Sequence, residues 1–225
     1  PMSHDRSNAD AGFRAMFEAA GKKAFDDRAG PLLFFAGGVV GYGAAQEHHR
    51  RGGADSATKR EKVYQKVFKM PCALPTRKCR TIYSMGVRQA VWRARLWEER
   101  DVHLVSAGVK DYADRLLTSH FCLHTEGNGW GTRLIDYSIA ECVLLLIDDA
   151  MQLIFEDLIP YPVISVRARK ADIPTIVARL RQLNDTALRE QLRVWRRAFS
   201  WGRPIGWAYE FTVANLVTVA LSRGL

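Results

Sequence analysis

The sequence has few cysteines, no long apolar run and a deficit of acidic residues. Four cysteines in 225 residues are too few for a disulfide scaffold. No segment approaches the ~20 apolar residues of a membrane-spanning helix, because residues 29–46 are rich in glycine and residues 211–221 are too few. Hydrophobic residues still make up 48% of the chain, so we expect a buried core and one, or at most two, globular domains.

The acidic deficit leaves 24 Asp and Glu against 33 Lys and Arg, a net charge of +9. The excess is concentrated in residues 50–80 and 179–203. Such segments are typical of solvated helix faces, of sites for nucleotides or acidic polysaccharides, and of nucleic-acid-binding proteins. Nucleic acid is not an expected partner, because no binding module is recognisable and aromatic residues do not interleave with the basic ones.

The four cysteines fall into two pairs of different character. Cys122 and Cys142 lie within apolar strand patterns and are expected to be small buried hydrophobic residues. Cys72 and Cys79 flank a proline-containing loop, where a local disulfide would form if the chain is luminal. Their spacing, and that of two histidines upstream, does not match the short ligand spacings of zinc sites, so no metal is predicted.

Short apolar runs alternate with segments of helical periodicity, which indicates an α/β fold with a doubly wound parallel sheet. The expected strands are residues 32–36, 101–106, 120–123, 143–147 and 163–166. The expected helices are residues 11–25, 85–100, 111–118, 132–140, 171–183, 186–199 and 206–222. In the helix at 186–199 the periodicity puts four residues off the apolar stripe: Arg189, Arg193, Arg196 and Arg197.

This order of elements predicts that the chain is divided into three regions. Residues 1–30 form a helical lead-in, residues 31–201 form a Rossmann-like domain, and residues 202–225 provide a closing helix. Within the domain, residues 39–82 carry glycine pairs, prolines and many charges, which is typical of a long insertion.

A glycine-rich turn follows the third expected strand. Gly127, Gly129 and Gly131 allow the backbone to approach a ligand closely, and the next helix directs its N–H groups and its dipole at the turn. Arg133 and Asp136 share one face of that helix. The pattern suits a phosphate-linked sugar or nucleotide. A purely structural turn is the alternative, because the glycines match neither a dinucleotide fingerprint nor a P-loop.

The glycine pairs and acids near the strand ends are expected to meet. Right-handed crossovers place the carboxyl ends of parallel strands at one rim of the sheet, where ligands bind. Gly37 and Gly38 follow the first expected strand. Residues 125–131 follow the third, and Asp148 and Asp149 follow the fourth. We therefore expect a single cleft at this rim.

Five motifs occur in order: Pro31-Leu-Leu-Phe-Phe-Ala-Gly-Gly38, Tyr83-Ser-Met-Gly-Val-Arg-Gln89, Ser119-His-Phe-Cys-Leu123, Gly129-Trp-Gly-Thr-Arg133 and Phe155-Glu-Asp-Leu-Ile-Pro-Tyr161. This set resembles the exostosin-like glycosyltransferases (family 47), from about residue 31 to about residue 201. The resemblance implies the C-terminal, donor-binding half of a GT-B enzyme, in which two Rossmann-like domains face each other. It also implies sugar transfer from a nucleotide-sugar, expected to carry UDP, to a glycan or cell-wall polysaccharide.

By this resemblance, Asp136 stands where the family has an acid that accepts hydrogen bonds from the ribose hydroxyls. The alternative is that Asp136 only complements the dipole of its own helix. Arg133 and Arg88 are candidates for neutralising the diphosphate. The alternative for Arg133 is an ion pair with Asp136, and the alternative for Arg88 is a surface position on a helix. Trp130 is a candidate wall for the base or sugar, or a core anchor. The other donor-site candidates are Gly37, Gly38, Gly127, Asn128, Gly129 and Gly131.

Enzymes of this type look like metal-independent inverting transferases, so no cofactor and no metal are expected. The nucleotide-sugar is then the donor substrate and a glycan is the acceptor. A general base must deprotonate the acceptor hydroxyl, and in a GT-B enzyme it comes largely from the N-terminal half. No base is assigned here. His120 and His124 flank the relevant strand end, but a histidine on a core strand is more often structural.

Family members are usually Golgi type II membrane proteins with an N-terminal anchor and an N-terminal Rossmann half. Neither is recognisable here, so we expect a fragment or a degenerate relative on the luminal side, attached to the membrane only through an anchor absent from this chain. A non-catalytic sugar-nucleotide- or glycan-binding remnant is the alternative function, and a basic polyanion-binding module ranks below it.

The chain departs from the family pattern in two segments, one before and one after the expected site helix. Glu141-Cys-Val-Leu-Leu145 stands where the family has Gly-Cys-Val-Pro-Val. Thr125-Glu126 stands where relatives often carry proline and a small or polar residue. Losing the glycine puts a carboxylate at a tight helix-to-strand junction, which raises doubt about activity more than about fold.

Overall fold

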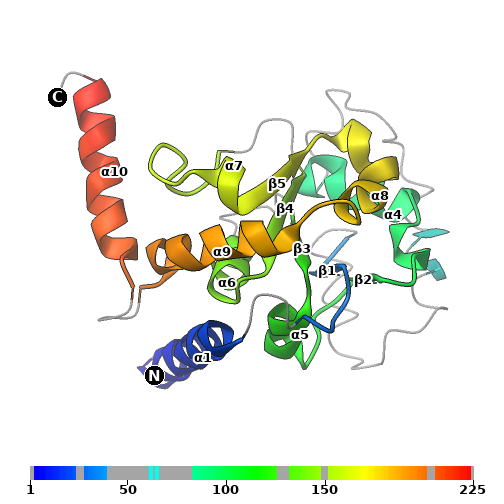
Figure 1. Ribbon diagram of the computed structural model, residues 1–225, viewed down its shortest axis with the longest axis horizontal. Helices are drawn as coiled ribbons and strands as arrows, with labels where there is room; N and C mark the ends of the chain where they lie inside the picture. The colour runs from blue at the N-terminus through cyan, green and yellow to red at the C-terminus, as the bar shows by residue number, and fades with distance from the viewer. Residues whose placement is uncertain are drawn as a thin grey trace.

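The computed structural model describes residues 3–23, 28–39, 61–62, 64–65, 83–125, 132–147, 152–201 and 206–223. These residues fold around a five-stranded, all-parallel sheet with the order β2-β1-β3-β4-β5 (Figure 1). The strands are β1 (Leu33–Ala36), β2 (Val102–Val105), β3 (Phe121–His124), β4 (Val143–Ile147) and β5 (Ser165–Ala168). The predicted α/β fold with a parallel sheet is confirmed.

The three central strands are covered on both faces, which is why they are continuous apolar runs. Every residue of β1, β3 and β4 is buried. In the ladder, Leu33 is aligned with Val102 and Phe121, and Cys122 is aligned with Leu144. Because successive side chains point to opposite faces of the sheet, each strand contributes to two separate core clusters.

Helices cover both faces of the sheet, as a doubly wound fold requires. One set packs on the cluster that contains Phe35 and Leu123: η2 (Tyr83–Gly86), α4 (Val87–Arg93), η3 (Leu96–Glu98), η4 (Lys170–Thr175) and α8 (Ile176–Leu180). The other set packs on the cluster that contains Phe34 and Cys122: α1 (Ser3–Lys22), α5 (Tyr112–Thr118), α6 (Thr132–Ile139), α7 (Tyr161–Ile164), α9 (Asp185–Trp195) and η5 (Arg196–Phe199). Figure 1 shows α4 and α8 on the opposite side of the sheet from α6 and α9.

The helix predicted at 11–25 begins earlier, at Ser3, and ends at Lys22. Two further predicted boundaries are wrong for local backbone reasons. The helix predicted at 85–100 is divided into η2, α4 and η3, because Met85 and Arg95 adopt positive φ angles of 44° and 54°. The strand predicted at 163–166 begins at Ser165 instead, because α7 occupies the residues before it. Neither shift alters the order of elements or the composition of the sheet.

The strand order changes direction between β1 and β3. From β1 the chain crosses to β2 on one side of β1, and it later returns to β3 on the other side. In open parallel sheets, ligands bind outside the carboxyl ends of the two strands between which the strand order changes direction. In this fold those ends are Ala36 and His124.

Glu141 lies at the junction between α6 and β4 and is fully buried. Its φ of 56° is left-handed, a conformation that costs a non-glycine residue about 1–2 kcal/mol. Two arginines offset this cost. Arg193 contacts both carboxylate oxygens at 2.6–3.0 Å, and Nη1 of Arg196 lies 2.6 Å from Oε1. The carboxylate that stands in place of glycine is thus held by ion pairs.

The same arginines extend the contact to the N-terminal helix. Arg193 donates to the carbonyl oxygen of Lys23 at 2.8 Å. Arg196 donates to the carbonyl oxygen of Phe17 at 3.0 Å, and its Cζ lies 3.9 Å from the centroid of that ring. Glu141 therefore connects α1, the α9–η5 segment and the α6–β4 junction.

Two of the arginines that the periodicity put off the apolar stripe are buried rather than on a solvated face. Arg189 is 1% exposed and Arg196 is 9% exposed. Arg189 forms an ion pair with Asp185, whose carboxylate also lies 2.9 Å from Nδ1 of His120. Helical periodicity alone could not locate these side chains, because their partners come from other parts of the sequence.

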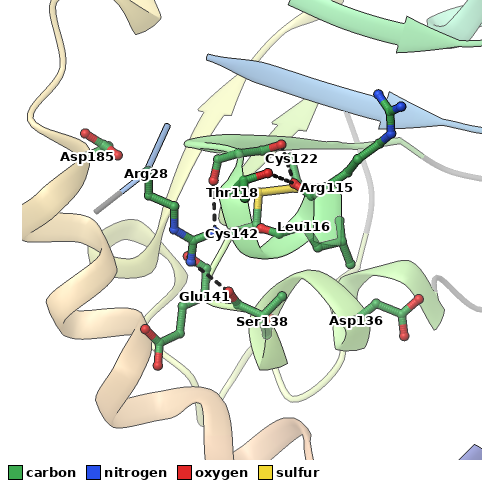
Figure 2. Close-up of a disulfide and its surroundings, with 12 residues drawn as sticks. Arg28, Arg115, Leu116, Thr118, Cys122, Asp136, Ser138, Glu141, Cys142 and Asp185 are labelled. Atoms are coloured by element: carbon green, nitrogen blue, oxygen red, sulfur yellow. Dashed lines mark hydrogen bonds between the residues drawn. A yellow bond between two sulfur atoms is a disulfide. The ribbon is translucent and has the colours of Figure 1, made fainter. Parts of the chain in front are cut away.

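Cys122 and Cys142 are joined by a disulfide bond (Figure 2), which corrects the expectation that they are simply small buried hydrophobic residues. Both are fully buried. The bond ties β3 to the residue before β4, across a separation of 20 residues that includes α6. Cys72 and Cys79 lie outside the described residues.

Arg28 lies beside this disulfide (Figure 2). Its guanidinium donates to four main-chain carbonyl oxygens at the ends of α5 and α6: those of Leu116, Ser119, Ala140 and Glu141. Burial lowers the pKa of Arg28 to about 10, so the group stays charged at neutral pH. Arg28 thereby satisfies carbonyls that the helix ends leave without partners.

α10 (Ala208–Ser222) is the predicted closing helix and extends from one end of the molecule (Figure 1). In its first turn, the ring of Phe211 lies 5.7 Å from that of Phe155 and 6.3 Å from that of Trp195. Further along, its apolar side chains are exposed, among them Val213, Leu216, Val217 and Leu221. Across the described ranges, no helix combines the length and apolarity needed to cross a bilayer.

Replacing Glu141 by Gln should lower the free energy of unfolding by about 3–5 kcal/mol, because Arg193 and Arg196 would remain largely buried without a carboxylate. Urea unfolding followed by circular dichroism measures the loss. Glu99→Gln is the matched control, since Glu99 pairs with Arg181 on the surface and its loss should change the midpoint little.

A second variant separates the ion pairs from the backbone strain at this position. Glu141→Gly removes the strain of the positive φ along with the carboxylate, and we expect it to remain well below the wild type in stability. A Glu141→Gln protein with the urea midpoint of the wild type would show that the ion pairs do not hold the junction.

Candidate functional site

The predicted donor-site residues fall into two groups. Five belong to the described part of the chain and lie at the carboxyl rim of β1 and β3 or on helices that reach it: Gly37, Gly38, Arg88, Arg133 and Asp136. The others lie outside the described residues: Gly127, Asn128, Gly129, Trp130 and Gly131. Asp148 and Asp149 and most of the insertion at 39–82 also lie outside them.

Arg88 is held at the rim by the turn that opens α4. Residues 84–86 all have positive φ angles, and α4 begins directly after them. Arg88 is only 4% exposed, which is inconsistent with the alternative of a surface position. Its Nε donates to Oγ1 of Thr125 at 2.8 Å, and its Nη1 donates to the carbonyl oxygen of Gly38 at 2.9 Å. Thr125, which departs from the family's proline, thus provides an acceptor that orients Arg88.

Arg133 extends from α6 over the end of β1. A Cβ atom added to Gly37 would lie 2.5 Å from Nη2 of Arg133 and 2.8 Å from its Cζ. Glycine at position 37 is therefore required for the guanidinium to lie where it does. The alternative ion pair with Asp136 does not form, and the described residues give Arg133 no carboxylate within ion-pair distance.

Arg88 and Arg133 approach one point from opposite faces of the sheet. α4 packs on one face and α6 on the other, yet the two Cζ atoms lie 5.3 Å and 5.4 Å from the centroid of the Phe35 ring. Both positive charges also act on His124, whose pKa they lower after the larger effect of burial. Guanidinium groups bind phosphate or carboxylate through paired N–H donors, so this rim has the chemistry of an anion site.

Asp136 lies one turn further along α6. Within the described residues, its carboxylate accepts a single, long hydrogen bond, from the hydroxyl of Tyr112 at 3.4 Å. Burial raises the pKa of Asp136 to about 6, although the Tyr112 hydrogen bond and the charge of Arg133 act in the opposite direction. The carboxylate is therefore half-buried with few partners among the described residues, and hydroxyl donors from a ligand would satisfy it.

His124 is a site residue that sequence reasoning set aside as structural. It ends β3, is 3% exposed, and meets the ring of Tyr137 edge to face at 6.4 Å. Its Nδ1 is enclosed, and no described residue forms a hydrogen bond with it. Burial, with the charges of Arg133 and Arg88, lowers the pKa of His124 to about 4. In the sequence, the position of His124 shortly before the predicted glycine-rich turn could have identified it as a residue of the rim.

Metal-binding residues are not grouped at this rim. Among the residues that the structure describes, no three His, Cys, Asp or Glu side chains come close enough to hold a metal ion. Among the described residues, the positive charge available to an anion at this rim comes from Arg88 and Arg133.

A separate hollow of about 700 Å³ lies at the amino ends of β1 and β2, lined by residues 29–31 and 97–103. Its acidic residues already have partners. Glu99 and Asp101 each lie 2.7 Å from Nη2 of Arg181, and Glu98 pairs with Arg95. Because ligands of open parallel sheets bind at the carboxyl ends, we assign the functional site to the opposite rim.

Comparison with known proteins agrees with this geometry. The exostosin GT47 domain matches residues 21–183, a range that contains all five strands and both arginines of the rim. A similar protein is a probable glucuronoxylan glucuronosyltransferase of Arabidopsis thaliana, 27% identical over 129 residues. The aligned segment is 55% of this chain and 27% of that protein, so the chain spans about a quarter of that relative's length. On the strength of the domain match, the chain belongs to the exostosin GT47 family of glycosyltransferases.

Proposed function

We propose that this chain is the donor-binding domain of a glycosyltransferase whose donor is a nucleotide-sugar carrying UDP. The observation that supports this most strongly is the convergence of Arg88 and Arg133 between β1 and β3. In the proposal, the two guanidinium groups hold the diphosphate and the carboxylate of Asp136 accepts the ribose hydroxyls. The glycine-rich turn at 126–131 would add backbone N–H donors.

In the proposed reaction, an acceptor hydroxyl oxygen bonds to the anomeric carbon of the sugar while the bond from that carbon to the diphosphate oxygen breaks. The hydroxyl proton passes to a general base, and the nucleoside diphosphate leaves with the electron pair. Negative charge grows on the leaving oxygen, so Arg88 and Arg133 would stabilise the transition state more than the bound substrate. The proposal assigns charge neutralisation to these arginines and includes no metal.

The acceptor, expected to be a glycan or cell-wall polysaccharide, and the general base are proposed to lie in a second domain that faces the rim. The chain spans only about a quarter of its curated relative, which leaves room for such a domain in a longer protein. The Golgi lumen is the proposed location. The Cys122–Cys142 disulfide supports it, because such bonds persist in oxidising compartments.

A non-catalytic protein that binds sugar nucleotides or glycans is the second candidate. The departures from the family pattern favour it. Thr125 stands in place of proline at the rim, and Glu141 stands in place of glycine at the far end of α6, where that helix meets β4. The two candidates share the donor site and differ only in catalysis. A sugar-transfer assay on the longest natural protein that contains this sequence distinguishes them, because the second candidate binds donor without transferring sugar.

Calorimetric titration with UDP tests the donor site. The wild-type chain should bind UDP and transfer no sugar alone, because no facing domain orients an acceptor or excludes water. Asp136→Ala should weaken binding by about tenfold or more, as expected for the loss of a charged hydrogen-bond acceptor. Asp114→Ala, an exposed change of the same charge on α5, should have no effect. Equal affinities in wild type and Asp136→Ala would remove Asp136 from the site, and absence of UDP binding by the wild type would refute the proposal.

Gly37→Ala tests the position of Arg133 without changing the net charge. The new methyl group should displace the guanidinium, so UDP binding should weaken by about three- to tenfold. Gly12→Ala is the control, since a Cβ at position 12 meets no atom within 4 Å and should leave the affinity unchanged. If Gly37→Ala binds UDP as tightly as Gly12→Ala, Arg133 does not act on the diphosphate from this position.

Asp136→Asn should stabilise the unliganded protein at pH 7.5 while it weakens UDP binding. Because burial raises the pKa of Asp136 from 3.8 to about 6, ionisation of this group opposes folding above pH 6. The raised pKa corresponds to a loss of about 3 kcal/mol in the free energy of unfolding at pH 7.5, which Asp136→Asn should recover. The difference in stability between the two proteins should vanish below about pH 4, where the carboxyl is protonated in both the folded and the unfolded state. Urea midpoints measured across this pH range give the difference. A less stable Asp136→Asn protein at pH 7.5 would indicate a structural role for the carboxylate.

A further inference from the structure

His124 has an unusual environment for a histidine at the end of a core strand. Its side chain lies on the face of the sheet covered by α6, beside the ring of Tyr137. Its Nδ1 is enclosed and finds no hydrogen-bond partner in the part of the chain that the structure describes, a condition that costs a buried polar group about 1–3 kcal/mol. Native proteins seldom leave such a group unsatisfied without a functional reason.

The charged groups around His124 come from the helices on both sides of the sheet. α6 contributes Arg133, and α4 contributes Arg88. Tyr137 of α6 packs against the ring, and Tyr112 of α5 lies beside Asp136. Both arginines disfavour a proton on the imidazole, and burial acts in the same direction. His124 is therefore a neutral ring beside two cations.

An anion bound by the two arginines would change this balance. A diphosphate carries at least two negative charges and would cancel the repulsion that Arg88 and Arg133 exert on a protonated ring. The imidazolium would then have an attractive neighbour in a site that excludes water, where such interactions are stronger than in solution. Occupancy of the site and protonation of His124 would be thermodynamically linked.

We propose that His124 is a proton-coupled positioning residue of the donor site: its ring is neutral when the site is empty and takes up a proton from solvent when a diphosphate binds Arg88 and Arg133. The inference rests on the donor site proposed above. Apart from the N–H bond on the ring, no covalent bond forms, and the proton returns to solvent when the diphosphate leaves. In its charged state His124 adds a third positive charge near the leaving group.

Nuclear magnetic resonance of protein labelled with ¹³C at histidine tests the inference on the wild-type chain. Titrations run from about pH 4.5 to about pH 7.5, without ligand, with saturating UDP-glucose and with saturating inorganic pyrophosphate. Without ligand, the His124 signals should keep the shifts of a neutral ring down to about pH 5. With either ligand, the midpoint should rise by at least one pH unit, a tenfold change in the protonation equilibrium.

His120 is the matched control on the same strand. It precedes β3, at the opposite end from the rim, and pairs with Asp185 at 2.9 Å, so its signals should be the same with and without ligand. His124→Gln assigns the His124 signal by its disappearance. His120 signals that change on ligand addition together with those of His124 would indicate a general conformational effect and overturn the inference.

The two ligands separate failure of this inference from failure of the proposed function. If UDP-glucose binds and His124 stays neutral, the inference is overturned and the donor site stands. If pyrophosphate raises the His124 midpoint but UDP-glucose does not bind, the coupling to a diphosphate is supported and the nucleotide-sugar function is overturned. If neither ligand binds, both are overturned.

Discussion

The buried carboxylate of Glu141 is the interaction on which the arrangement of the helices depends. It binds Arg193 and Arg196, and these arginines also contact main-chain carbonyls of the N-terminal helix region. The adjacent Cys142 is bonded to Cys122 of β3, so the end of α6 is held from two directions. Because α6 also carries Arg133 and Asp136, the geometry of the rim depends on this junction. The two arginines lie beyond residue 183, where the family match ends.

The rim brings together two arginines and two groups with shifted pKa values. Elsewhere in the described residues, Arg181, Arg189 and Glu156 each have an oppositely charged partner, and Arg28 donates to four carbonyl oxygens. At the rim, Arg88 and Arg133 converge as like charges, Asp136 has a raised pKa and His124 has a lowered one. Such departures cluster where a ligand completes the set of interactions. In the proposed function, a diphosphate with an attached ribose would supply the complementary groups, namely negative oxygens for the arginines and hydroxyls for the carboxylate.

The sheet could be predicted from the sequence because its strands are short apolar runs bounded by polar or glycine-rich segments. The strand at 143–147 has the predicted limits, and the rim position of Gly37 and Gly38 follows from parallel topology alone. The break at Arg95 was not predictable, because no residue there signals a positive φ. The disulfide was missed because a cysteine in an apolar strand has the same pattern whether it is bonded or not. The burial of Arg88 and the unsatisfied ring of His124 depend on neighbours that only the folded chain brings together.

The enclosed disulfide has a practical consequence for following the motions of this domain. Once Cys122 and Cys142 are reduced, their sulfurs remain shut inside the layer between β3 and α6. A thiol-reactive probe can then reach them only in molecules where that layer has opened. The rate of labelling would report how often the layer between α6 and the sheet opens, and α6 is the helix that carries Arg133 and Asp136.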